Sequence, residues 1–176
     1  MKLGVIGLPN VGKSTFINRL YGGGITKTGD RPGVTKSNQW VKVSPFLEVL
    51  DTPGMLWPKL NDQRAATRLA YIGTIKDAVY DQEALCVSLL RDLLAVMPEE
   101  TAERYKIKNP DAGGYELLDE VCRGRGFLMR GGVCDVERAC AVILDEFREG
   151  KVGKLTLEDA PDAGGPQPLK GAQANA

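Results

Sequence analysis

The sequence predicts an α/β fold in two parts, a three-stranded sheet within residues 1–60 and an α-helical domain over residues 61–159. Three apolar runs have the length of a strand: Lys2–Ile6, Gln39–Val43 and Phe46–Leu50. After Gly54, apolar residues recur at the spacing of amphipathic helices. Residues 160–176 are rich in Ala, Gly and Pro, a composition that predicts a disordered tail.

The stretch that follows the first strand, Gly7–Ser14, fits the phosphate-binding pattern G-x-x-x-x-G-K-[ST]. A helix is expected over Ser14–Leu20, so the motif lies between a strand and a helix N-terminus, where backbone N–H groups face an anion. Lys13 is expected to contact the β- and γ-phosphates, and the Ser14 hydroxyl to bind Mg²⁺. We expect nucleotide contacts from this stretch at Gly7, Asn10, Val11, Gly12, Lys13, Ser14 and Thr15.

A second motif, Asp51-Thr52-Pro53-Gly54, ends the third strand. A carboxylate at the carboxyl end of a strand beside a P-loop can support a bound Mg²⁺, usually through water, which is the role expected of Asp51. The backbone N–H of Gly54 can contact a γ-phosphate. We therefore add Gly54 to the nucleotide contacts and Asp51 to the metal ligands.

The loop Gly29–Thr35 has the position of a nucleotide-dependent switch, between the first helix and the second strand. Thr35 is expected to bind Mg²⁺ and the γ-phosphate, so Lys13 and Thr35 are the candidate catalytic residues. The three motifs together indicate a nucleotide hydrolase of the GTPase type, built on a partial P-loop GTPase sheet. Thr35 would lose its contact with Mg²⁺ and the γ-phosphate after hydrolysis.

The motif that reads guanine in P-loop GTPases, [NT]-K-x-D, does not follow Gly54. Thr74-Ile75-Lys76-Asp77 places its Lys one position too late. Either the protein reads no base, or a base-reading part precedes the P-loop in a parent chain. The start of the first strand directly after Met1 favours the second explanation.

The motifs resemble those of the YlqF/RbgA family of circularly permuted ribosome-biogenesis GTPases. The resemblance rests on Gly7–Thr15, Thr28–Lys36 and Leu50–Lys59, and continues through Gly73–Asp77 and Gly124–Gly132. It implies GTP and GDP as ligands, the precursor of the large ribosomal subunit as the partner, and hydrolysis as the step that releases the protein. In that family the guanine-reading motifs lie N-terminal to the P-loop, so the resemblance implies a truncated chain that binds GTP weakly or aggregates.

Two residues bear on the mechanism. Many GTPases orient the attacking water with a Gln directly after the glycine that Gly54 matches, but this sequence has Met55, an apolar residue. We therefore expect slow turnover that depends on the ribosome or on a monovalent cation. Asn10 matches a K⁺ ligand of similar GTPases, although an Asn here can equally serve to adopt an unusual backbone angle.

Apolar stripes predict helices over Gln63–Ile75, Asp81–Met97, Glu99–Tyr105 and from Val136 to Phe147, with Asp135 as an N-cap. A hinge between the two parts is expected near Trp57–Asn61. The segment Arg123–Gly132 carries three arginines among glycines, which suits either a loop that grips RNA phosphates or a solvated connection. With the family resemblance, we expect RNA contacts at Arg123, Arg125 and Arg130.

Basic and acidic residues balance at 23 each, so any RNA contact requires a local patch. No signal peptide and no apolar run of about 18 residues is found, so we expect a cytoplasmic monomer with no membrane partner. The absence of His excludes imidazole catalysis, and four Cys without C-x-x-C spacing predict reduced, buried thiols.

The function that these observations predict is GTP binding and hydrolysis in late assembly of the large ribosomal subunit, with Mg²⁺ and K⁺ as the candidate cofactors. Two alternatives stay open. One is a P-loop ATPase or kinase-like hydrolase, which would show no preference for guanine. The other is an RNA-binding assembly factor with a vestigial nucleotide site, which would bind RNA without nucleotide.

Overall fold

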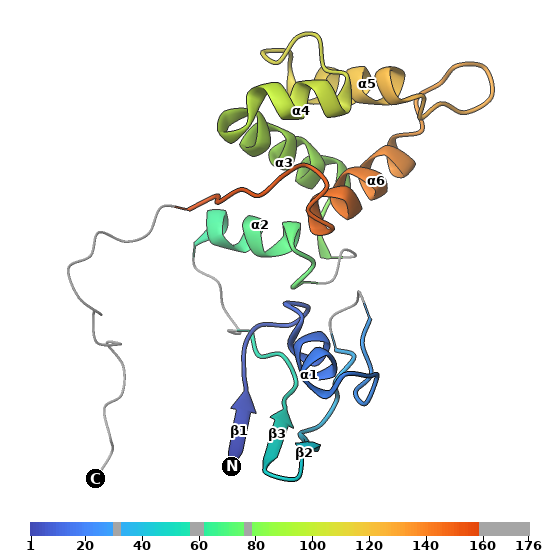
Figure 1. Cartoon of the computed structure of the whole chain (residues 1–176). Helices are drawn as coiled ribbons and strands as arrows, with labels where there is room; N and C mark the ends of the chain where they lie inside the picture. Colours follow the sequence, from blue (N-terminus) through green and yellow to red (C-terminus); the bar gives the residue numbers. More distant parts are fainter. Residues whose placement is uncertain (30–32, 57–61, 76–78, 159–176) are drawn as a thin grey trace.

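In a computed structural model, the chain forms a small α/β part and a larger helical part (Figure 1). The structure describes residues 1–29, 33–56, 62–75 and 79–158. Four expectations lie wholly or partly outside the described residues: the centre of the switch loop, the hinge near 57–61, Lys76-Asp77 and the tail 160–176.

The α/β part contains a sheet in the order β1-β3-β2 and one helix, confirming the predicted α/β class. Its elements are β1 (Lys2–Val5), α1 (Lys13–Tyr21), β2 (Gln39–Ser44) and β3 (Leu47–Asp51). The central strand, β3, pairs in parallel with β1 and antiparallel with β2. Each strand ends within one residue of the predicted bounds, because alternating apolar residues mark a half-buried strand well.

Helix α1 covers one face of this sheet. Ile17 from the helix packs with Val41 and Val49, and all three are buried. Side chains alternate along a strand, so the neighbouring residues Trp40 and Leu50 lie on the opposite face. Trp40 is 55% exposed there.

The helical part consists of five helices: α2 (Gln63–Tyr71), α3 (Gln82–Val96), α4 (Pro98–Tyr105), α5 (Gly114–Arg125) and α6 (Val136–Arg148). Asp62, Asp81 and Asp135 cap the N-termini of α2, α3 and α6 through their carboxylates. The helices share one large apolar core, at the centre of which α3 contacts α2, α4, α5 and α6. This part is therefore much better packed than the sheet.

The helices differ from the prediction in two places. The helix expected to reach Ile75 ends at Tyr71, since Gly73 has a φ of 68° and carries the chain out of the helix. Helix α5 was not predicted, and it includes Arg123 and Arg125, which were expected in a loop. The loop begins only after Gly126, a left-handed C-cap with a φ of 72°.

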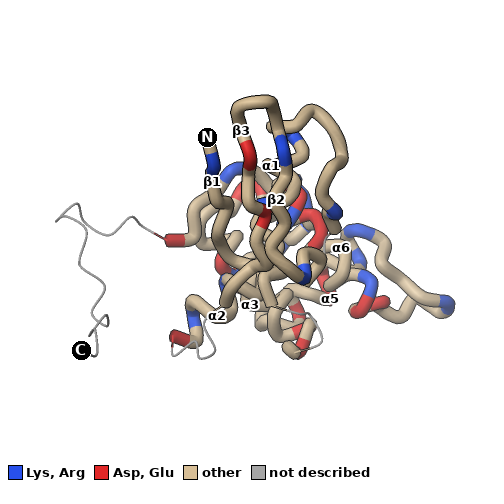
Figure 2. Tube along the Cα trace, turned by 90° about the horizontal axis from the view of Figure 1, so that it is seen from below, with Lys and Arg blue, Asp and Glu red and all other residues tan. Residues whose placement is uncertain are grey.

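Cys86, Cys122 and Cys140 are buried in the helical core, and Cys134 is half-buried. Within the described residues, no helix combines the length and apolar character needed to cross a lipid bilayer. Along the chain trace, basic and acidic residues occur in both the α/β part and the helical part (Figure 2).

Candidate nucleotide-binding site

The P-loop wraps around the N-terminus of α1 and forms one wall of a cavity of about 450 Å³. Gly12, the N-cap of α1, has a φ of 90°, and Asn10 has a φ of 58°. The Lys13 ammonium reaches back over the loop and donates a hydrogen bond of 2.6 Å to the Leu8 carbonyl. Positive φ angles of this kind occur in the curled loops that bind anions through backbone N–H groups.

Three oxygen-bearing side chains converge beside Lys13. The Ser14 hydroxyl donates a 2.8 Å hydrogen bond to Asp51 Oδ2 and lies 3.1 Å from Thr35 Oγ1. Thr35 Oγ1 is itself 3.5 Å from Asp51 Oδ2. The expected metal ligands, which are separated by up to 37 residues in sequence, therefore lie within hydrogen-bonding distance of each other.

This group fits a magnesium ion. Asp51 is 1% exposed, and its Oδ1 atom is buried without a hydrogen-bond partner among the described residues. A buried carboxylate oxygen without a partner is costly, and a metal-bound water or the metal itself would satisfy it. Two hydroxyls and a carboxylate are the oxygen ligands that Mg²⁺ prefers.

Charge in the cavity favours an anion as well. Burial lowers the pKa of Lys13, and the negative charge of Asp51 partly opposes that shift. A phosphate chain at the loop would stabilise the ammonium form and offset the cost of burying it. The cation is therefore placed where a bound triphosphate would need it.

The segment after β3 lies directly against the P-loop. Thr52 Oγ1 donates to the Val5 carbonyl at 2.7 Å, and the Met55 N–H donates to the Gly7 carbonyl at 3.1 Å. A Cβ atom on Gly54 would lie 2.3 Å from Pro9 Cα, so only glycine permits this approach. Met55 is 65% exposed, and its apolar side chain cannot orient water.

The start of the switch loop is anchored to α1, a contact that none of the three sequence motifs indicates. The Asn18 side chain accepts hydrogen bonds from the N–H groups of Ile25 and Thr26 and donates one to the Thr26 carbonyl. Thr26 Oγ1 also donates to the Ser14 carbonyl at 3.1 Å. Ser14 and Asn18 are four residues apart, so they lie on one face of a helix. This spacing was the feature of the sequence that could have indicated the anchor.

Most of the predicted contacts line the cavity: Asn10, Gly12, Lys13, Ser14, Thr15, Thr35 and Gly54. Gly7 does not line it and instead accepts the hydrogen bond from Met55. Val11 lines a second cavity, of about 1300 Å³, between the P-loop and the helical part. Asn10 lines both cavities, and a Cβ on Gly73 would lie 2.9 Å from its side-chain nitrogen.

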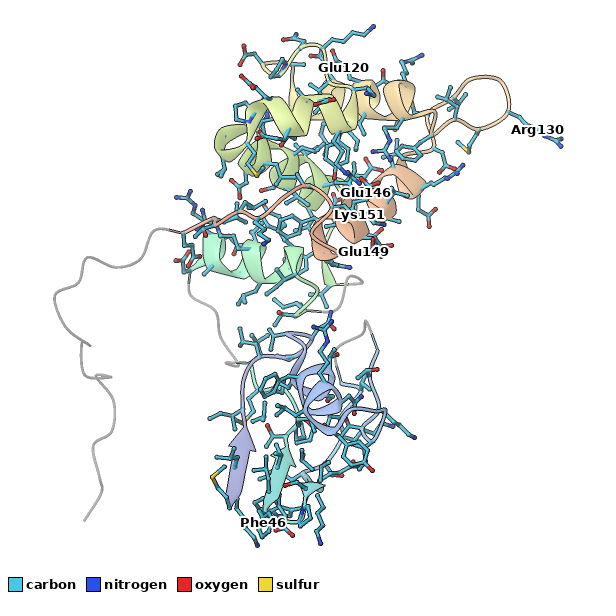
Figure 3. The ribbon with its side chains drawn as sticks, viewed as in Figure 1. Phe46, Glu120, Arg130, Glu146, Glu149 and Lys151 are labelled. Carbon is cyan, nitrogen blue, oxygen red and sulfur yellow. The ribbon has the colours of Figure 1, made fainter. Side chains whose placement is uncertain are left out.

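The three arginines expected to contact RNA have different surroundings. Arg123 pairs with Asp119 one turn earlier on α5. Arg125 is held inside the helical part, where it binds both Glu146, at 2.9 Å, and the Arg104 carbonyl. Arg130 extends from the tip of the loop between α5 and α6, away from the body of the protein (Figure 3).

Comparison with known proteins agrees with this geometry. The family model described as "50S ribosome-binding GTPase" matches residues 2–110, which include the P-loop, the switch loop and the segment after β3.

The chain belongs to this family.

Among relatives of the 50S ribosome-binding GTPase family, ribosome biogenesis GTPase A of Bacillus cereus is 45% identical to this chain over 160 residues, covering 91% of the chain and 54% of that protein. The protein of the same name from Priestia megaterium is 44% identical, over 94% of the chain and 57% of that protein. The chain thus spans little more than half the length of these relatives. The resemblance to the YlqF/RbgA group is confirmed.

Solved structures give the same result. A GDP-bound structure of TM YlqF matches with a TM-score of 0.58 and 26% identity, over 90% of this chain and 60% of that one. A GNP-bound structure of YlqF from T. maritima matches with a TM-score of 0.52 and 30% identity, over 85% of this chain and 55% of that one.

Proposed function

We propose that this chain binds Mg²⁺ and GTP at the P-loop cavity and hydrolyses GTP during assembly of the large ribosomal subunit. The observation that carries the proposal is the convergence of Ser14, Thr35 and Asp51 beside Lys13. The family membership and the nucleotide-bound state of the similar YlqF structures support guanine nucleotides as the ligands.

In the proposed mechanism, each residue has a role that its position permits. Lys13 and the P-loop N–H groups hold the β- and γ-phosphates, and Ser14 and Thr35 bind the metal, with Asp51 supporting it. A bound Mg²⁺ would neutralise charge that develops on the phosphates during transfer. The Gly54 N–H contacts the γ-phosphate. Loss of the γ-phosphate after hydrolysis would therefore release both Thr35 and Gly54.

Turnover is expected to be slow without a stimulating factor, because Met55 replaces the glutamine that orients water in many GTPases. We propose K⁺ as one such factor, with Asn10 among its ligands. Hydrolysis that is equally fast in K⁺ and Na⁺, with and without ribosomal particles, would exclude this role. Asn10 would then matter only for its left-handed backbone and its contact with Gly73.

The metal site can be tested by replacing Ser14→Ala, with Ser37→Ala as the matched control. Ser37 is exposed in the segment after Thr35 and does not line the cavity. We expect S14A to weaken Mg²⁺-dependent binding of a fluorescent GTP analogue at least tenfold, and S37A to leave it unchanged.

Preference for guanine can be tested by competition against the bound fluorescent analogue. Displacement of the analogue by GTP but not by ATP would support a GTPase, whereas equal displacement would favour the ATPase or kinase alternative.

We further propose that the helical part contacts ribosomal RNA through Arg130. This arginine projects into solvent, and its neighbours Met129 and Val133 are 52% and 58% exposed, as in a loop that docks on a partner. Arg125 is unsuited to this role, since its guanidinium already binds Glu146. The relatives' name, ribosome biogenesis GTPase A, supports a ribosomal partner.

The loop can be tested by measuring binding to large-subunit precursor particles at several salt concentrations. We expect Arg130→Ala to weaken binding and to reduce the slope of log affinity against log salt by about 1. Arg19→Ala is the control, because it removes an exposed cation from α1 in the other part of the chain. An unchanged slope in R130A would make the loop a simple connection. Particle binding that persists in S14A without nucleotide would favour the vestigial-site alternative.

A further inference from the structure

Lys27 is a second cation at the nucleotide cavity that no motif accounts for. Of the described residues that line this cavity, Lys13 and Lys27 are those with positively charged side chains. We propose that Lys27 binds the phosphate chain near the start of α1, and so retains GDP as well as GTP. This inference rests on the proposed function.

The backbone before Lys27 is fixed, although the side chain is exposed. Thr26 is 8% exposed, and the Asn18 side chain binds its N–H, hydroxyl and carbonyl groups. The Thr26 hydroxyl also donates to the Ser14 carbonyl. Lys27 therefore extends from an anchored residue, which reduces the entropy lost when it binds an anion.

The anchor also sets where along the phosphate chain Lys27 can act. Thr26 is bonded to the Ser14 carbonyl in the first turn of α1, so Lys27, which lines the cavity, directly follows a residue held against that turn. The γ-phosphate contact is expected from Gly54, which packs against Pro9 of the P-loop. With the γ-phosphate assigned to Gly54, we infer that Lys27 acts on the α- and β-phosphates, which GDP and GTP share.

Among the described residues, the Lys27 ammonium has no competing partner. No hydrogen bond or ion pair joins its side chain to any other residue in the described part of the chain. Binding a phosphate would therefore not require breaking an ion pair with any described residue. A lysine suits this task, because its ammonium group can contact a phosphate as a point charge from several directions.

The same segment provides a matched control. Lys36 directly follows Thr35, is exposed like Lys27, and does not line the cavity. Removing either lysine changes the net charge of the protein equally. Any difference between the two variants therefore reports the local position of Lys27 and not a general electrostatic effect.

The test measures affinity and dissociation rate for fluorescent GDP and for a fluorescent non-hydrolysable GTP analogue in wild type, Lys27→Ala, Lys27→Arg and Lys36→Ala. We expect K27A to weaken both nucleotides by a similar factor of about ten, mostly through faster dissociation. K27R should restore most of the affinity, and K36A should match wild type. Far-UV circular dichroism checks that each variant is folded.

Each other result overturns the inference in a recognisable way. Equal affinities in K27A, K36A and wild type would show that Lys27 does not contact the nucleotide, while leaving the proposed function intact. A loss confined to the GTP analogue would place Lys27 at the γ-phosphate instead. If wild type binds neither nucleotide, the proposed function fails and the inference fails with it.

Discussion

Single residues determine how closely the two walls of the nucleotide cavity approach each other. Gly54 packs against the backbone of Pro9, and the adjacent Met55 N–H bonds to Gly7. This contact brings the segment after β3 to the P-loop without any side chain between them. At this scale the site depends on the absence of a Cβ atom as much as on charged groups.

The Gly54→Ala variant tests this close approach. The added methyl group would lie 2.3 Å from Pro9 Cα, so the segment must move away from the P-loop. We expect affinity for a non-hydrolysable GTP analogue to fall at least tenfold and affinity for GDP to change much less, since Gly54 is proposed to contact only the γ-phosphate. Isothermal titration calorimetry measures both.

Gly4→Ala is the control for that variant. A Cβ atom on Gly4 meets no atom within 4 Å, although it lies on the strand that precedes the P-loop. Normal binding of both nucleotides by G4A is expected. Equal losses of GTP and GDP affinity in G54A would contradict the assignment of Gly54 to the γ-phosphate.

At the scale of elements, one carboxylate joins three helices. Glu146 on α6 binds Arg104 of α4 and Arg125 of α5, each at 2.9 Å. Burial of Glu146 works against its ionisation, but the hydrogen bonds from Arg125 and Arg104 outweigh it and hold its pKa below the ordinary value of 4.5. Arg125 also lies over the rings of Tyr105 and Phe127.

Glu146→Gln should lower the free energy of unfolding by roughly 3 kcal/mol at neutral pH, because two partly buried guanidinium groups lose their counter-charge. The carboxylate has a lowered pKa in the folded state. Its contribution is therefore fully present above pH 4.5 and is lost as the pH falls through the lower, folded-state pKa. Urea unfolding at neutral and acidic pH should show the difference between E146Q and wild type shrinking in acid.

Glu137→Gln on the same helix controls for the loss of one negative charge. Glu137 is exposed in the first turn of α6, where a carboxylate contributes only a fraction of a kcal/mol. A difference between E146Q and wild type that stays constant from neutral pH into acid would show that the charge of Glu146 is not what stabilises the helices.

At the scale of the whole molecule, the two parts differ greatly in packing. The sheet and α1 bury a small cluster around Ile17, Val41 and Val49, whereas the helical core includes residues from all five helices of that part. The cavity of about 1300 Å³ lies between the P-loop and the helices. Such an arrangement predicts that the α/β part is the less stable one.

Unfolding in urea can separate the two parts without any mutation. Trp40 lies on β2 in the α/β part, and most of the helix signal comes from the helical part, while Trp57 lies outside the described residues. We expect the tryptophan fluorescence transition to occur at a lower urea concentration than the far-UV circular dichroism transition. Mg²⁺ with a GTP analogue should shift the fluorescence transition to higher urea, closer to the circular dichroism transition. Coincident transitions without ligand would show that the protein unfolds as one unit.

The features that local patterns encode could be predicted from the sequence. The P-loop and the three strands needed only a few neighbouring residues for their recognition, and the Asp135 cap needed one residue and its spacing to the next helix. Ser14, Thr35 and Asp51 were assigned from motifs, because each lies at a fixed point relative to a strand or helix end. Their convergence is what a metal site requires.

The remaining features depended on contacts between distant segments. Nothing near Arg125 in the sequence shows that Glu146 neutralises it, so an arginine expected at RNA lies instead between helices. The residues around Lys27 in the sequence do not show that Asn18 holds the preceding Thr26 beside the nucleotide cavity. The sequence by itself determined which chemical groups the protein has and which local structures display them. Only the tertiary structure decided which charges remain available to a ligand, because a charge already paired within the fold must lose that partner before it can bind another.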